Sequence, residues 1–169
     1  MLTEEFPGAC EAMNDIQSCW QGDALVHEWV LPDGHTAYVP VMERVSKKIE
    51  VDNLNHATFT HIAAVNAPQE SGISLAANVI HSIDGYVVRE MIRRAHKQGF
   101  VLLTIHDSFW AHPNYMNEVR DNYRQILAEI SEMNLLDNIL SQILGYEVEV
   151  TKQGPCIADE IRESEYALS

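Results

Sequence analysis

The sequence lacks the features that mark several large classes of protein. No apolar run approaches the about 18 residues that a transmembrane helix needs. Residues 1–6 contain two glutamates and no basic stretch, so no secretory signal is predicted. Cysteine occurs only three times and without C-x-x-C spacing, which indicates free thiols in a reducing compartment rather than a disulfide framework.

Motifs of several common catalytic sites are also missing. The chain has no glycine-rich phosphate loop, and no G-x-S-x-G nucleophile elbow surrounds Ser108. Its eight histidines do not follow metal-ligand spacing, so a structural zinc site is not expected. The remaining candidates for chemistry are carboxylates and basic side chains.

Positive charge is scarce, with 11 Lys and Arg against 25 Asp and Glu and a formal net charge of −14. This balance alone argues against nucleic-acid binding, because phosphate contacts need cations. The basic residues nevertheless gather in two groups, Arg44, Lys47 and Lys48, and Arg89, Arg93, Arg94 and Lys97. Each group is either a solvated face or a surface for phosphate, and the pattern leaves both interpretations open.

The chain is organised around residues 99–113. The apolar run from Phe100 to Ile105 predicts a strand buried on both faces, and it leads directly into His106, Asp107 and Ser108. A carboxylate at the exit of such a strand could bind Mg²⁺, which takes one or two protein carboxylates together with phosphate oxygens and water. The alternative is that Asp107 only begins a turn or caps a helix.

The rest of the pattern predicts one domain of α+β class. We expect helices at 7–20, 75–98, 114–133 and 135–144, with Asn114 as an N-cap and with Gly99 and Gly145 as C-terminal stops. Gly85 is a candidate break in the second helix, with Asp84 as the cap of its continuation. Asp33-Gly34 predicts one β-hairpin, and residues 46–65 predict another with a turn at 52–55.

Five stretches stand out along the chain. They are H-E-W-V-L-P-D-G at 27–34, Q-E-S-G-I at 69–73, A-N-V-I-H-S-I-D-G at 77–85, L-T-I-H-D-S-F at 103–109 and E-S-E-Y-A-L-S at 163–169. In this order they resemble the C-terminal part of the single-subunit DNA-directed RNA polymerases of phages and mitochondria. Ser108, which follows His106 and Asp107, favours RNA synthesis. The related DNA polymerases resemble this motif but have glutamate in place of the serine.

The resemblance implies a role for each motif. Asp107 would be the second metal-binding aspartate of the palm, and His81 would be a catalytic-site residue near the ribose of the incoming nucleotide. Contacts to the nucleotide or the RNA–DNA hybrid would come from His106, Asn78, Asp84, Arg89 and Arg93. The hairpin at about 44–66 would be the promoter-specificity hairpin, with Arg44, Lys47, Lys48, Asn53, Asn55 and His56 as DNA contacts. Ser169 would end the C-terminal foot.

The implied organisation is a partial palm, with helices packed on a small and mostly antiparallel sheet and a protruding hairpin. Residues 1–26 would form an N-terminal helix and 27–74 the hairpins. Residues 75–145 would form the palm with its H-D-S motif, and 146–169 the foot.

The resemblance also implies that the site is incomplete. The first catalytic aspartate and the fingers of the family lie upstream of anything in this sequence, and a two-metal site needs acids from at least two places. We expect a Mg²⁺ site shared with the remaining polymerase chain, activity only in that complex, and DNA template, nascent RNA and nucleoside triphosphates as partners, without a membrane. The chain is then the small subunit of a split phage polymerase in the cytoplasm of an infected bacterium, or a shortened form of a longer polymerase.

Two other functions fit parts of the pattern. A self-sufficient nuclease or phosphohydrolase would use Asp107 together with Asp84 on shared metal ions. A non-catalytic DNA-binding or assembly module would use the basic hairpin and the basic helix.

Overall fold

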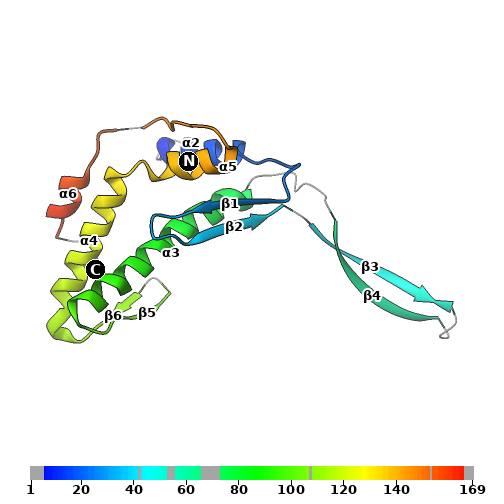
Figure 1. The fold of residues 1–169 in the computed structure, drawn as a ribbon, viewed down its shortest axis with the longest axis horizontal. Coiled ribbons are helices and arrows are strands. Elements are labelled where there is room, and N and C mark those ends of the chain that lie inside the picture. The colour runs from blue at the N-terminus through cyan, green and yellow to red at the C-terminus, as the bar shows by residue number, and fades with distance from the viewer. Residues whose placement is uncertain are drawn as a thin grey trace.

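The computed structural model describes residues 6–41, 43–52, 56–65, 73–106, 108–152 and 154–165, without the side chains of 43–45 and 63–65. The described elements are α2 (Pro7–Ser18), β1 (Val26–Val30), β2 (Thr36–Pro40), β3 (Glu43–Val51), β4 (Ala57–Val65), α3 (Ile73–Gln98), β5 (Leu103–Ile105), β6 (Ser108–Trp110), a 3₁₀ turn (Pro113–Tyr115), α4 (Met116–Glu132), α5 (Leu135–Leu144) and α6 (Ala158–Glu163). The strands form three separate antiparallel pairs, which confirms the α+β class (Figure 1). Among the described helices, none is both long and apolar enough to span a bilayer.

The hairpin β1–β2 forms where Asp33-Gly34 predicts it. Val30 pairs with Thr36, and Gly34 takes a φ of +80°, which glycine adopts without strain. Residues with alternating polarity put His27, Trp29 and Val39 into the core. The side-chain amide of Gln142 on α5 then bonds both backbone polar groups of Val30, at 2.8 and 3.1 Å, and so occupies part of the β1 edge.

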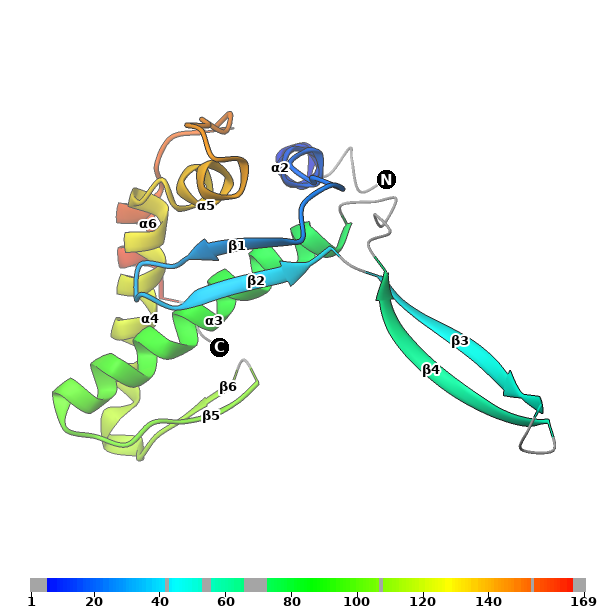
Figure 2. The ribbon, with the colours of Figure 1, turned by 45° about the vertical axis from the view of Figure 1, so that its right-hand side comes forward.

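The long helix α3 joins two apolar clusters. Its N-terminal half packs with β1–β2, α2 and α5 in a cluster that contains Trp29, Leu75, Val79 and Leu140. Its C-terminal half packs with α4 in a second cluster, whose buried members are Val87, Met91, Ala95, Phe100, Val119 and Ile126. Figure 2 shows α3 running beneath β1–β2 and onward to α4.

The expected break at Gly85 is wrong, because α3 is continuous through it. Tyr86 and Val87 directly after the glycine are buried, and their packing outweighs the about 1 kcal/mol that glycine costs inside a helix. Asp84 is therefore an exposed residue inside the helix and not a cap.

The predicted helix ends are confirmed where glycine defines them. Gly99 and Gly145 follow α3 and α5 with φ of +83° and +76°. The N-cap prediction for Asn114 is wrong: α4 begins at Met116 after the 3₁₀ turn, and the backbone N–H of Asn114 donates to His112 Nδ1 at 3.3 Å. Helix α2 likewise ends at Ser18, two residues before the predicted end.

The second hairpin, β3–β4, is a ribbon of two nine-residue strands that pair from Glu43↔Val65 to Val51↔Ala57. It projects away from the helices (Figures 1 and 2). None of its described side chains belongs to either apolar cluster. A two-stranded ribbon without such packing is marginally stable in water, so this one is suited to binding something outside the body of the chain.

Candidate functional site

The hairpin β5–β6 carries the H-D-S motif between two very short strands. Ile105 pairs with Ser108, so His106 and Asp107 connect the strands. His106 has a φ of +55°, in the left-handed region that the first loop position of a tight hairpin requires. Asp107, the residue to which the sequence assigns metal binding, lies outside the described residues.

The prediction of a strand buried on both faces is wrong for the chain as it stands. Thr104 and Phe109 face the helices, and the Phe109 ring lies 6.0 Å from that of Tyr123 on α4. On the opposite face Leu103, Ile105 and Trp110 are 59 to 63% exposed. The cause is the size of the sheet: helices cover one face of these two strands, and no described element covers the other.

A second polar surface lies between β2 and α3, around a cavity of about 320 Å³. The sequence-predicted residues Asn78, His81 and Arg89 line it together. The structure adds His35 and Tyr38 from the β1–β2 hairpin, which sequence reasoning missed. One helix face and one hairpin thus bring three predicted contact residues to a single hollow.

The side chains that line this cavity differ in how many hydrogen bonds they form within the protein. Asn78 donates to the Ser74 carbonyl at 2.7 Å, one turn earlier in α3. Ser82 accepts from Trp29 Nε1 at 3.0 Å and donates to the Val79 carbonyl at 2.7 Å, so its hydroxyl braces the hairpin against the helix. His81 is exposed and forms no hydrogen bond or ion pair with the described residues. It is therefore available to a ligand.

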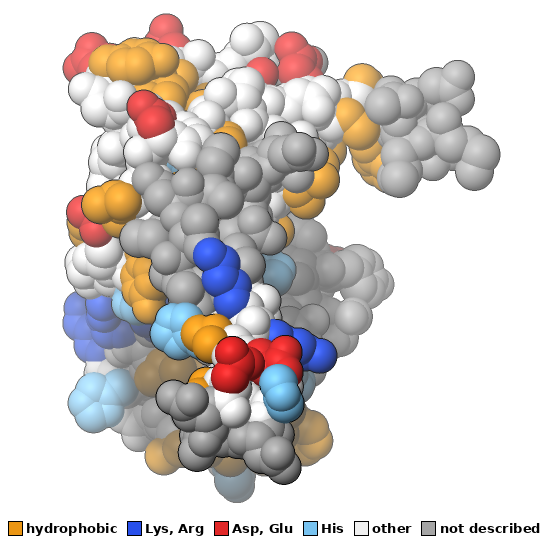
Figure 3. All heavy atoms as spheres, turned by 90° about the vertical axis from the view of Figure 1, so that its right-hand side faces the viewer, with side chains coloured by type: hydrophobic (Ala, Val, Ile, Leu, Met, Phe, Trp, Pro, Cys, Tyr) orange, Lys and Arg blue, Asp and Glu red, His pale blue; other side chains and the backbone are white. Residues whose placement is uncertain are grey.

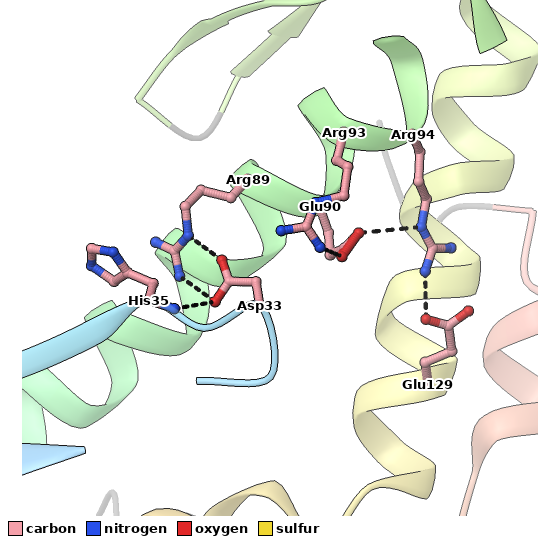
Figure 4. A network of polar contacts seen from close by, with 7 residues as sticks. All are labelled: Asp33, His35, Arg89, Glu90, Arg93, Arg94 and Glu129. Atoms are coloured by element: carbon pink, nitrogen blue, oxygen red, sulfur yellow. Dashed lines mark hydrogen bonds and ion pairs between the residues drawn. The ribbon is translucent and has the colours of Figure 1, made fainter. Parts of the chain in front are cut away.

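Arg89 is held in place by Asp33, from the turn of β1–β2 (Figure 4). The guanidinium donates from Nε to one carboxylate oxygen and from Nη2 to the other, the latter at 3.3 Å. Burial raises the pKa of Asp33, but the hydrogen bonds from Arg89 and from the His35 N–H outweigh it, so the pKa lies below its ordinary value. Asp33 is thus a fixed anion and Arg89 a fixed cation at the rim of the cavity.

The rest of the predicted basic ridge faces elsewhere. Arg93 pairs with Glu90, and Arg94 pairs with Glu129 of α4 at 2.5 Å. With Lys97 they line a different hollow of about 600 Å³ between α3 and α4. Asp84 does not line the β2–α3 cavity. The i, i+4 spacing therefore does not place Arg89 and Arg93 at one site, because Asp33 and Glu90 draw their guanidinium groups apart.

The β3–β4 hairpin carries the predicted DNA contacts that the structure describes. Lys47 is opposite His61 and Lys48 is opposite Thr60, so neighbouring lysines lie on opposite faces of the ribbon. Lys and Arg, Asp and Glu, and His side chains meet on the front surface in Figure 3, which views the molecule with this hairpin toward the reader. The side chain of Arg44, and Asn53 and Asn55 entirely, lie outside the described residues.

His56, one of the predicted DNA contacts, lies beside two carboxylates. Its Nδ1 lies 2.8 Å from Glu50 and 3.6 Å from Asp52, and these two carboxylates would repel phosphate. The three side chains form the one group in the described part of the chain that could close around a metal ion, with ligand atoms within 4.8 Å of one another. Sequence reasoning missed this group, whose members come from the end of β3, the residue after it and the residue before β4.

The C-terminal segment runs back along α4. Helix α6 is joined to it by Arg162 and Glu132 at 2.6 Å and by a bond from Arg124 to the Ser164 carbonyl at 2.8 Å. Ser169, the predicted end of the foot, lies outside the described residues.

The described part of the chain thus combines the hairpin with the H-D-S motif, a polar cavity between β2 and α3, and a projecting ribbon. Residues 20–166 match the model of the family described as DNA-dependent RNA polymerase. The chain therefore belongs to the phage-type single-subunit DNA-dependent RNA polymerases. No curated protein matches it. Polymerases of this family use Mg²⁺, and they copy a DNA template from nucleoside triphosphates.

Proposed function

We propose that this chain forms the C-terminal part of an RNA polymerase palm, with Asp107 as one of two metal-binding aspartates and the other supplied by a further chain or segment. The observation that carries the proposal is the uncovered apolar face of β5–β6, directly beside His106 of the H-D-S motif. The family match over residues 20–166 supports it as well.

That face has the character of an interface. Leu103, Ile105 and Trp110 lie together on it, and Val101 next to it is 75% exposed. Leu103 and Trp110 also line a hollow of about 670 Å³ that reaches to Tyr115. Contiguous apolar surface of this kind marks protein contact sites. We therefore assign the remaining polymerase, with its first catalytic aspartate, as the partner that covers it.

A carboxylate is the ligand type that Mg²⁺ prefers, so Asp107 suits the metal, but one carboxylate is too few for a two-metal site. Bound Mg²⁺ would lower the pKa of the RNA 3′ hydroxyl and neutralise charge on the triphosphate. Asp107 would hold the metal, next to His106 with its φ of +55°.

The cavity between β2 and α3 would face the nucleotide and the RNA–DNA hybrid. His81 has no partner among the described residues and would contact the ribose or the new base pair. Arg89 would bind phosphate oxygens, because a guanidinium presents several donors in a planar fork. Asp84 and Arg93, which lie outside the cavity, would have supporting roles at most.

The β3–β4 ribbon would read promoter DNA. A two-stranded ribbon fits the major groove, where each base pair presents a distinct pattern of donors and acceptors. Lys47 and Lys48 supply the positive charge that its described part offers to phosphate.

The test is reconstitution. We expect a larger chain to copurify with this one from the native source, and the pair to synthesise RNA only with Mg²⁺. Asp107→Asn should raise the activation barrier by several kcal/mol and so slow RNA synthesis about a thousandfold, without preventing assembly. RNA synthesis by this chain alone, or near-normal synthesis by the assembled Asp107→Asn variant, would show the assignment to be wrong.

The projecting ribbon also favours a second candidate, a non-catalytic DNA-binding module. It requires salt-dependent DNA binding by the lone chain, unchanged by Asp107→Asn, and no effect of that substitution on RNA synthesis. The two candidates are thus separated by the same variant.

A further inference from the structure

Two residues 56 positions apart, one inside a sequence motif and one just after another, meet in one ion pair. Asp33 is the penultimate residue of H-E-W-V-L-P-D-G, and Arg89 lies one turn of helix after the glycine of H-S-I-D-G. The side chain of Asp33 is only 2% exposed, whereas that of Arg89 is 32% exposed. The carboxylate is therefore enclosed, and the guanidinium is partly open to solvent. Figure 4 shows the two side chains pointing toward each other.

The pairing leaves one end of the guanidinium open. Nε and Nη2 donate to Asp33, while Nη1 has no hydrogen-bond partner among the described residues. Nη1 passes Gly85 so closely that a Cβ there would lie 3.1 Å from it. Gly85 and Arg89 both line the β2–α3 cavity. The carboxylate thus binds one side of the guanidinium, and the absent side chain at Gly85 leaves room for the other side.

We infer that Asp33 is a positioning residue of the polymerase site: it fixes Arg89 so that Nη1 points along Gly85 into the cavity and meets a phosphate of the template–RNA hybrid. The inference rests on the proposed function, which makes this cavity face the hybrid. The role differs from ion pairing for stability alone, because it depends on the direction of the guanidinium and not only on its charge.

A second pair on the same helix provides a matched comparison. Arg94 and Glu129 join α3 to α4 at 2.5 Å, with side chains 23 and 29% exposed, and neither lines the β2–α3 cavity. Burial raises the pKa of Glu129, yet its hydrogen bond from Arg94 lowers it below the ordinary value, as happens at Asp33. Glu129→Gln therefore weakens an arginine–carboxylate pair of the same kind away from the cavity.

The experiment uses the complete polymerase that contains this chain, on a DNA template with a short RNA. Asp33→Asn should raise the KM for the template–RNA hybrid about tenfold while kcat changes little, because a charged hydrogen bond that orients the ligand contact is lost. Arg89→Lys should have the same effect, and the double variant should be no worse than Arg89→Lys. Glu129→Gln should lower Tm comparably and leave KM unchanged.

Each other outcome has a definite meaning. If Arg89→Lys leaves KM unchanged, the cavity does not bind the hybrid and its part in the proposed function fails. If Arg89→Lys raises KM and Asp33→Asn does not, only the positioning role is overturned. Should Asp33→Asn prevent assembly, Asp33→Glu decides, because it keeps the ion pair but moves it by one methylene: a raised KM supports the inference and an unchanged one overturns it.

Discussion

His27 is the buried histidine among the described residues, and its environment sets a pH dependence at the scale of a single side chain. It packs against Trp20 at 4.9 Å, and its Nε2 accepts a hydrogen bond from the Gln21 backbone at 3.2 Å. Burial lowers its pKa below the ordinary value of 6.5. The folded state therefore binds this proton less readily than the unfolded chain does.

The sign of the effect follows from that difference. Below about pH 6.5 the unfolded chain takes up the proton first, so stability falls as the pH drops toward the folded pKa and is regained above 6.5. We expect the His27 ring signals in an NMR titration to give an apparent pKa below the ordinary value of 6.5. A titration midpoint at or above 6.5 would contradict this prediction.

A substitution at Gly85 should have two opposite effects, one on the stability of the helix and one on the position of Arg89. Gly85→Ala should raise helix stability by up to about 1 kcal/mol, because alanine is the better helix former. Its Cβ would meet Arg89 Nη1 at 3.1 Å and displace the guanidinium. We expect the complete polymerase to bind its template–RNA hybrid more weakly although this chain melts no earlier. His96→Ala, at an exposed site of the same helix, is the control that should leave hybrid binding unchanged.

At the scale of elements, the sequence predicts those turns and helix ends that depend on adjacent residues alone. Asp33-Gly34 defines a turn, and Gly99 and Gly145 end helices because only glycine enters the left-handed region freely. The sequence pattern gives the wrong structure where contacts between residues far apart in the chain determine it. Gly85 stays helical because its neighbours are buried in two clusters, and Arg89 and Arg93 separate because Asp33 and Glu90 bind them. No local signal marks Asp33 as the partner of Arg89.

The β3–β4 ribbon yields a prediction that its register makes specific. The face of Lys47 also carries His61 and the half-exposed Ile49 and Phe59. The face of Lys48 carries the exposed Ile62 and four polar side chains, Ser46, Glu50, Thr58 and Thr60. Base edges are read by polar groups, so the face of Lys48 should enter the groove.

Lys48→Ala should therefore weaken promoter binding and reduce the salt dependence by about one phosphate contact. Lys47→Ala, the control on the opposite face, should have a smaller effect. Binding isotherms of the complete polymerase at several salt concentrations measure both, and a larger effect of Lys47→Ala would reverse the assignment of the two faces.

At the scale of the whole molecule, the proposed partner would cover apolar surfaces that no described element covers. The run from Phe100 to Ile105 is a pattern of burial, yet Leu103 and Ile105 are exposed in this chain. A second apolar groove, of about 460 Å³, lies between α2 and α3 and is lined by Met13, Ile73 and Ile80. These are the surfaces that the proposed assembly with the rest of a polymerase would bury.

Leu103→Glu tests this interpretation. The side chain is already 63% exposed, so the substitution should change the stability of the lone chain by no more than about 0.5 kcal/mol. In the polymerase it would bury an unpaired charge, which costs several kcal/mol, and the partner should no longer copurify. Ile62→Glu, at a similarly exposed isoleucine on the projecting ribbon, should leave copurification intact. Copurification of Leu103→Glu at wild-type yield would mean that the β5–β6 face stays open to solvent and that the second aspartate reaches Asp107 from elsewhere.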